Sequence, residues 1–293
     1  MLLQVVSQLL GVILLMLVGA TLVFVGRERL ARTRSEYRDR FTAVAPYVGL
    51  LGVVLVANKV ARDIGPDLSF LVGIRITSTL QQIDGMILWP LFGAETPQFV
   101  LWLQTMATPE LTAYFSFIYI YGYVFLLVFP LIAYFALPDP EPLRRTMVAY
   151  GANYLIGVLC YIVFIAYAPW NTILDSLLYT EYSQYQFITT EVNDETNVFP
   201  SLHTSMAVTA AHLAWLSRDE YPTWAPVAAV LAVSVLIATM YLGIHWATDV
   251  IFGIMLGYVS VRIGVYMEDT PPSLENIRSR ANGLWSAIPG RSR

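Results

Sequence analysis

Charged residues are scarce in this sequence. Asp, Glu, Lys and Arg together make up 13% of the 293 residues, whereas a typical soluble domain carries about 25%. The apolar residues are 57% of the chain and fall in long runs. Since a run of about 20 apolar residues can cross a bilayer, we exclude a soluble domain and predict a membrane protein.

Cysteine occurs only once, as Cys160 inside an apolar run. A single cysteine excludes a disulfide within the chain and a cysteine-rich metal site. No other group of residues has the spacing of metal ligands, so we predict that the protein needs no metal and no other cofactor. As partners we expect the lipid bilayer and a membrane lipid substrate, and no nucleic acid.

The apolar runs predict an all-α fold, a polytopic transmembrane helical bundle with about seven spans. The runs cover residues 2–25, 42–60, 113–136, 146–168, 202–217, 224–244 and 246–266. The first run is too long for a signal peptide, and no cleavage site of small residues follows it. We therefore expect a retained helix there.

Basic residues predict the orientation of these spans. Fourteen arginines fall on the side that holds the C-terminus, and only Lys59, Arg62 and Arg75 fall on the other side. Loops rich in Lys and Arg stay in the cytoplasm. We therefore expect an outer N-terminus and a cytoplasmic C-terminus, in a prokaryotic cell membrane.

The spans divide the chain into four parts. We expect N-terminal transmembrane helices in 1–60, an interfacial or re-entrant outer segment in 61–112, a transmembrane core in 113–266 and a cytoplasmic tail in 267–293. The outer segment contains apolar pieces that are too short to span a bilayer.

Two short polar clusters stand at the ends of predicted spans, and the first begins the span 202–217. It reads Phe-Pro-Ser-Leu-His at 199–203. Pro200 and Ser201 are typical of a helix N-terminus, where free backbone N–H groups and the helix dipole favour an anion. His203 is thus placed to act on a phosphate, with ordinary helix capping as the alternative interpretation.

The second cluster joins the last two spans and contains His245 and Asp249. A spacing of four residues places both on one face of a helix. There the carboxylate can accept the imidazole N–H and make the other ring nitrogen a better nucleophile or base. A structural hydrogen bond at a helix start is the alternative interpretation.

Both clusters lie on the predicted outer face, and they hold two of the three histidines. The third, His212, lies nine residues after His203, which is about 13 Å deeper along a helix. We expect His212 to be buried, hydrogen-bonded and outside the site.

These clusters resemble two motifs of the type 2 phosphatidic acid phosphatase superfamily. Pro-Ser-Leu-His at 200–203 matches the motif Pro-Ser-Gly-His except at one position. His245 and Asp249 match the end of Ser-Arg-x5-His-x3-Asp, with Ala238 and Thr239 in place of Ser and Arg. The superfamily's Lys-x6-Arg-Pro motif has no counterpart here. The resemblance covers roughly residues 113–266.

One branch of this superfamily, the inositol phosphorylceramide synthases and their relatives, resembles the sequence more closely than the general motifs do. It shares Phe-Pro-Ser-Leu-His at 199–203 and a Thr-Met-Tyr-Leu run at 239–242, and Ala-Pro-Trp at 168–170 resembles its Pro-Pro-Trp signature. The resemblance implies a six-helix phosphatase-type catalytic core with an added N-terminal helix.

The resemblance also implies roles for the polar residues. His245 would attack phosphorus and form a phospho-histidine without a metal, Asp249 would orient His245, and His203 would protonate the leaving alcohol. Backbone amides near Ser201 would bind phosphoryl oxygens. The family's basic motif residues are absent, so other side chains become candidates for substrate binding: Lys59, Arg62, Arg75 and Tyr241.

The expected activity is that of a lipid phosphatase or phosphotransferase in phospholipid metabolism, either a phosphoric monoester hydrolase or a headgroup transferase. Water and an alcohol lipid are nearly equal candidates as the acceptor. A membrane transporter and a catalytically inactive scaffold are the alternatives from other classes.

Overall fold

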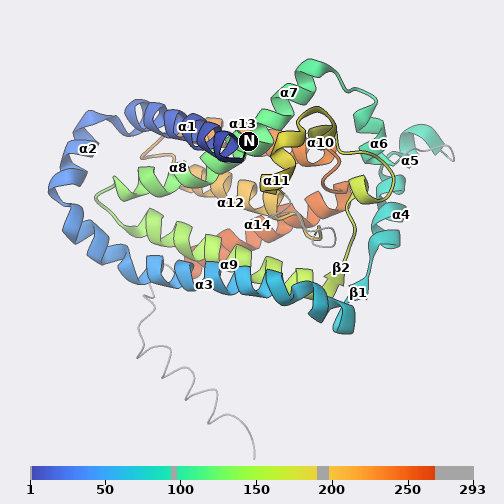
Figure 1. Ribbon diagram of the computed structural model, residues 1–293. Helices are drawn as coiled ribbons and strands as arrows, with labels where there is room; N and C mark the ends of the chain where they lie inside the picture. The colour runs from blue at the N-terminus through green and yellow to red at the C-terminus, as the bar shows by residue number, and fades with distance from the viewer. Residues whose placement is uncertain (1, 94–97, 190–197, 268–293) are drawn as a thin grey trace, which may run out of the picture.

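The computed structural model describes residues 2–93, 98–189 and 198–267. The long elements are all helices, which confirms the predicted all-α bundle (Figure 1). Within these residues, six helical stretches are long and apolar enough to cross a membrane. They are Leu3–Ser35, Tyr37–Ala61, Pro109–Phe135, Glu141–Val163, Trp224–Tyr241 and Ala247–Met267. The predicted tail 267–293 lies, apart from Met267, outside the described residues.

The N-terminal part is a helical hairpin. α1 (Leu2–Ala20) continues through a π-helical turn, η1 (Thr21–Val25), into α2 (Gly26–Ser35), and α3 (Tyr37–Val72) runs back along the bundle (Figure 1). α3 packs on α9 (Glu141–Val163). Because α3 ends at Val72, it extends beyond residue 60, where we predict the end of the N-terminal helices from the sequence.

Short elements follow α3 at one end of the bundle (Figure 1). They are β1 (Ile74–Arg75), α4 (Thr77–Ile87), α5 (Trp89–Phe92) and α6 (Phe99–Gln104). β1 pairs in parallel with β2 (Phe164–Ile165), with Ile74 opposite Phe164. This pairing draws 164–165 out of the helix, so α9 ends at Val163 rather than near 168 as predicted.

The remaining helices form the centre of the molecule. α7 (Pro109–Phe117), η3 (Ile118–Gly122) and α8 (Tyr123–Phe135) make one continuous span. After α9 and β2, the chain forms short turns and helices at the same end as α4: η4 (Pro169–Asn171), α10 (Leu177–Glu181), η5 (Ser183–Tyr185) and α11 (Gln186–Thr189). Then come α12 (Leu202–Leu216), α13 (Trp224–Tyr241) and α14 (Ala247–Met267).

The fifth predicted span, α12, has only 15 residues and is not among the six long apolar stretches. It packs against α8, α9, α13 and α14, and its polar side chains bond inward. Asn153 of α9 donates to Thr209 Oγ1 at 3.1 Å and accepts from Ser205 Oγ at 2.8 Å. Buried polar groups are stable when they are paired in this way.

Glycines let α14 approach α12 closely. A Cβ atom at Gly253 would lie 2.7 Å from the carbonyl oxygen of Ser201, and one at Gly257 would lie 2.7 Å from that of Ser205. Only a residue without a side chain fits these contacts. The start of α12 is thereby held against the first three turns of α14.

Candidate active site

The site lies where α12 and α14 begin, and a direct bond joins the two helix starts. Ser201 is the N-cap of α12, and its Oγ accepts from the Thr204 N–H at 3.2 Å. The N–H of Ser201 donates to the carbonyl oxygen of Asp249 at 3.1 Å. Ser201 therefore performs the predicted capping and also fixes α12 to α14.

The loop between α13 and α14 presents His245. Gly243 takes φ +79°, a conformation that favours glycine. The N–H groups of Ile244 and His245 both donate to the carbonyl oxygen of Thr239, at 2.9 and 3.0 Å. This tight turn holds the His245 backbone against the end of α13 and directs the imidazole into the protein.

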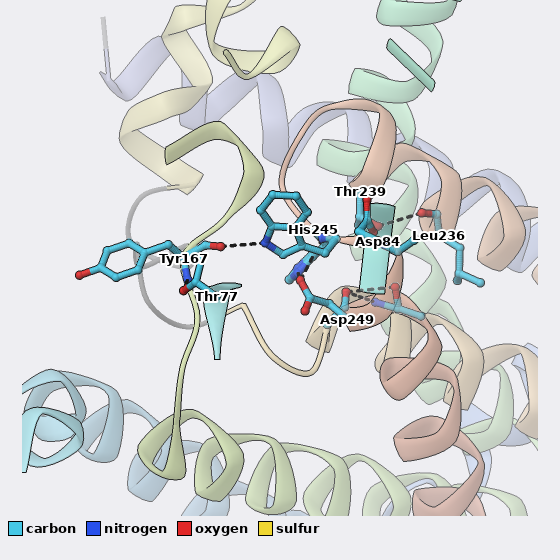
Figure 2. A network of polar contacts seen from close by, with 11 residues as sticks. Thr77, Asp84, Tyr167, Leu236, Thr239, His245 and Asp249 are labelled. Atoms are coloured by element: carbon cyan, nitrogen blue, oxygen red, sulfur yellow. Dashed lines mark hydrogen bonds and ion pairs between the residues drawn. The ribbon is translucent and has the colours of Figure 1, made fainter. Parts of the chain in front are cut away.

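Asp249 lies in the first turn of α14 and serves two groups at once. Its Oδ2 accepts from the Trp246 N–H at 2.9 Å and lies 3.5 Å from His245 Nδ1 (Figure 2). The first contact is the reach-back bond of a helix capping box. The second is longer than a hydrogen bond, so the imidazole is aligned with the carboxylate without being bonded to it.

Burial keeps His245 uncharged. The residue is 3% exposed and Asp249 is 0% exposed. Burial lowers the pKa of His245 to about 3, and a hydrogen bond to the Val198 backbone acts in the opposite direction. At neutral pH the imidazole is therefore neutral, which is the form that can act as a nucleophile.

A second buried carboxylate, Asp84 of α4, completes the start of α14. Asp84 is 0% exposed, and its Oδ1 accepts from the Ala247 N–H at 2.7 Å (Figure 2). Its Oδ2 accepts from the Val100 N–H at 3.4 Å. Burial raises the pKa of Asp84 to about 6, opposed by these backbone bonds and increased further by the nearby Asp249.

The sequence reasoning missed Asp84. The only local signal is an acidic residue inside a piece of mostly apolar and uncharged residues, 76–92. Its partner lies 163 residues away, and no periodicity in one sequence reports such a distance.

The two helix starts differ as places for an anion. At α14, the N–H groups of Trp246 and Ala247 are occupied by carboxylates. At α12, the capping group is the neutral hydroxyl of Ser201. Because a helix N-terminus attracts anions while carboxylates repel them, the start of α12 is the better place for a phosphoryl group.

His203 faces this place from the first turn of α12. Its ring centroid lies 5.9 Å from that of His245, so one small group can be reached by both imidazoles. Two tyrosines of the α7–α8 span, Tyr119 and Tyr123, lie on His203 with ring centroids 4.7 Å away. The structure thus brings together the three residues predicted to be catalytic.

The back of the site is formed by the chain after β2. Trp246 is fully buried, and its Nε1 donates to the carbonyl oxygen of Tyr167 at 2.8 Å (Figure 2). The Tyr167 N–H in turn donates to Thr77 Oγ1 at 3.0 Å. These bonds connect the histidine loop to the start of α4.

Two of the basic residues predicted to bind phosphate, Lys59 and Arg75, lie on the surface of the protein. Lys59 forms an ion pair with Asp63 at 2.8 Å on the exposed surface of α3, where its side chain is 66% exposed. Arg75 is exposed on β1. The side chain of Arg62 lies outside the described residues.

Tyr241 and His212 have contacts of their own. The hydroxyl of Tyr241 is 2.8 Å from Thr112 Oγ1, and its ring packs on Phe115 at 4.8 Å, so this side chain joins α13 to α7. His212 stacks on Tyr258 at 5.7 Å. Both observations describe helix packing rather than contacts with His203 or His245.

In the described part of the chain, no group of three or more His, Cys, Asp and Glu side chains is arranged to hold a metal ion. The chemistry that the site itself offers is that of two imidazoles and a carboxylate.

Comparison with known proteins gave one match. The sequence model of the PAP2 superfamily matches residues 95–263, which include α12, α13 and nearly all of α14. No curated protein and no solved structure showed a significant match to the chain.

Proposed function

This chain belongs to the PAP2 superfamily, and on that premise we propose that it transfers the phosphoryl group of a membrane lipid through a phospho-histidine at His245. The observation that carries the proposal is the convergence of His203, His245 and Asp249 at the joined starts of two helices. A phosphatase-type lipid phosphoesterase is the activity that superfamily membership supports.

In the first half of the reaction, a neutral nitrogen of His245 attacks phosphorus and the bond from phosphorus to the lipid oxygen breaks. His203 in its protonated form gives its proton to the leaving oxygen. The carboxylate of Asp249 lies 3.5 Å from His245 Nδ1 in the structure. It stabilises the positive charge that develops on the imidazole. The contact of His245 with the Val198 backbone is released as the phosphorus approaches.

In the second half, water or an alcohol attacks the phosphorus and the bond to His245 breaks. His203 takes the proton from the attacking oxygen, which restores both histidines. With a phosphomonoester substrate, water attack releases inorganic phosphate and attack by an alcohol lipid gives a new phosphomonoester. With a phosphodiester substrate such as phosphatidylinositol, the headgroup stays on phosphorus, so water attack releases the headgroup phosphate and attack by an alcohol lipid gives a new phosphodiester. The step needs no metal in this scheme.

The start of α12 supports binding of the phosphoryl oxygens. Ser201 caps this helix with a neutral group, and the helix dipole adds a preference for negative charge. Ser201 is therefore our main candidate for phosphate contact. The roles of Lys59, Arg62, Arg75 and Tyr241 stay predictions.

Transfer to an alcohol, as in inositol phosphorylceramide synthases, is the second candidate. It is favoured by the leucine in Pro-Ser-Leu-His at 200–203 and by Thr-Met-Tyr-Leu at 239–242. We also propose that the site opens to the extracytoplasmic face, because the basic residues gather on the side of the C-terminus.

The test uses purified wild-type protein and two histidine variants, His245→Ala and His212→Ala, with a metal chelator present. Short-chain phosphatidic acid, a polyprenyl pyrophosphate and phosphatidylinositol are supplied with and without an alcohol lipid. Free phosphate and new lipids are followed together, and protein-bound phosphate is measured under alkaline conditions. His212 is the matched control because it stacks on Tyr258 outside the site.

We expect His245→Ala to lose turnover and bound phosphate, while His212→Ala keeps both. Free phosphate or free headgroup phosphate identifies a phosphatase, and a new lipid that carries the transferred phosphoryl group identifies a transferase. If wild-type protein and His245→Ala behave alike on every substrate, the proposal fails and a transporter or scaffold becomes the better reading of the fold.

A further inference from the structure

A cavity of about 530 Å³ lies directly beside the candidate active site. α4 lines it with Leu80 and Ile83, α9 with Ile156 and Cys160, and α14 with Thr248 and Phe252. A volume of this size is typical of sites for small molecules.

The cavity is lined almost wholly by carbon and reaches the lipid-facing surface. Phe252 and Met255 of α14 border it and are 43% and 56% exposed. In a membrane-spanning helix, exposed apolar side chains face the hydrocarbon of the bilayer. The opening between α4, α9 and α14 is therefore accessible to a lipid chain without passage through water.

Two buried residues of the cavity lining are sequence neighbours of the candidate site residues. Pro200, which precedes the capping Ser201, and Thr248, which precedes Asp249, both line it. Thr248 is only 3% exposed, and its Oγ1 has no hydrogen-bond partner within the described residues. A buried hydroxyl without a partner is unusual in a folded protein and calls for one.

We propose that this cavity binds one hydrocarbon chain of a long-chain lipid phosphate, with the Thr248 hydroxyl donating to an oxygen at the head of that chain. The inference rests on the proposed function and specifies its substrate class. The wall formed by α4 (Thr77–Ile87) precedes the PAP2-matched residues 95–263. Chain selectivity is thus set partly by a segment outside the match.

The experiment uses the full chain in phosphatidylcholine vesicles with a phosphatidic acid that carries a photoreactive diazirine in the middle of one acyl chain. Crosslinked residues are mapped by mass spectrometry, with excess unlabelled dioleoyl phosphatidic acid as competitor. Cys160→Trp fills the cavity, and Cys160→Phe fills it less. Leu159→Trp is the matched control, because Leu159 lies on the same helix and is 54% exposed.

Crosslinks are expected on the cavity side of α4 and α14 and should disappear with competitor. Because the Trp side chain would occupy the space that the hydrocarbon chain needs, Cys160→Trp should lower the yield by roughly tenfold. Leu159→Trp should not change it. Thr248→Val, which keeps the side-chain shape, should lower the yield by roughly threefold to tenfold.

Crosslinks spread over outward residues such as Leu155 and Leu159, or a yield unchanged in both Cys160 variants, would overturn the assignment of the cavity. The proposed function is judged separately, since crosslinking needs no turnover and should persist in His245→Ala. Cavity crosslinks without His245-dependent turnover in the wild type would remove the proposed function and leave the cavity. His245-dependent turnover with scattered crosslinks would remove the cavity assignment and leave the proposed function.

Discussion

The two halves of the chain meet the membrane in different ways. In the most apolar windows of Leu3–Ser35 and Tyr37–Ala61, 17% of the residues are buried, whereas in those of Pro109–Phe135 and Glu141–Val163 the share is 56%. The N-terminal helices therefore turn most of their surface to lipid. The later spans turn more of theirs to one another, since even Trp224–Tyr241 and Ala247–Met267 have 50% and 39% of their windows buried.

Glycines show the same difference at atomic scale. A Cβ atom at Gly11, Gly49 or Gly52 would meet nothing within 4 Å, but at Gly253 or Gly257 it would collide with backbone oxygens of α12. The later half is thus built for close contact around the histidines. Asp84 is the exception, since it comes from the first half and caps a helix of the second.

The largest effect is expected from replacing His203, the proposed general acid, in the later half. His203→Ala should lower kcat/KM by roughly 10²- to 10⁴-fold, the usual contribution of a general acid. With a substrate whose leaving group has a low pKa, the loss should shrink, because that group departs without a proton. Steady-state kinetics on both substrates check this. Equal losses on both would assign His203 to binding alone.

The next largest effect is expected from adding a methyl group at a glycine of the contact between α12 and α14. Gly253→Ala places a methyl group 2.7 Å from the Ser201 carbonyl oxygen. The overpacking should cost about 1–3 kcal/mol of stability and, by shifting α12 from α14, reduce turnover by roughly tenfold. Gly52→Ala has free space and should stabilise α3 by about 0.5–1 kcal/mol. Thermal unfolding in detergent measures both, and equal shifts would erase the contrast between the halves.

Asp84 tests whether the first half supports the site. Asp84→Ala leaves the buried Ala247 N–H without its acceptor, which should cost about 1–3 kcal/mol. Asp84→Asn keeps an acceptor oxygen and should recover most of the stability and the turnover. If the two variants lose equal stability, the bond to Ala247 is not what Asp84 contributes.

A smaller effect concerns pH. Burial raises the pKa of Asp84 from 3.8 to about 6, so its contribution to stability is lost as the pH rises through about 6. Burial lowers the pKa of His245 from 6.5 to about 3, so its contribution is lost as the pH falls below about 6.5. Between about pH 4 and 6 the two trends oppose each other in the wild type.

Asp84→Asn removes one of these trends. The unfolding temperature of this variant should therefore rise with pH between about 4 and 6 more steeply than that of the wild type. Unfolding scans at several pH values measure the two slopes. Parallel slopes would show that Asp84 is already ionised in the folded protein.

The smallest effect is expected at the exposed basic residue of the first half. The Lys59–Asp63 pair is 66% and 58% exposed, and exposed pairs contribute little. Lys59→Met should change kcat/KM by less than about twofold. A loss comparable to that of His203→Ala would instead identify Lys59 as a phosphate ligand and break the division between the halves.

Much of the fold could be predicted because a bilayer demands long apolar helices. The runs at 224–244 and 246–266 correspond closely to α13 and α14. Helix ends set by distant partners could not be predicted: α9 stops at Val163 because β2 pairs with β1. The continuation of α3 to Val72 was missed for a related reason, since it lies along α9.

The candidate site likewise has parts that the sequence predicts and parts that depend on tertiary packing. The proximity of His245 and Asp249 follows from their spacing of four residues, and that of His203 from the shared face of the bundle. Asp84 and the cavity wall of α4 depend on tertiary packing. Tyr241 is close to His245 in the sequence, yet the helix directs its hydroxyl to Thr112.

The bond from Ala247 to Asp84 also bears on biogenesis. Its acceptor is synthesised early and its donor 163 residues later, so a nascent chain that stops before α14 contains one carboxylate without its partner. The dry surroundings that keep His245 neutral arise only when the last helix inserts beside α4, α9 and α12. Under the proposed function, the reactive form of His245 therefore arises only after α14 has inserted, and a chain that stops before α14 would lack it.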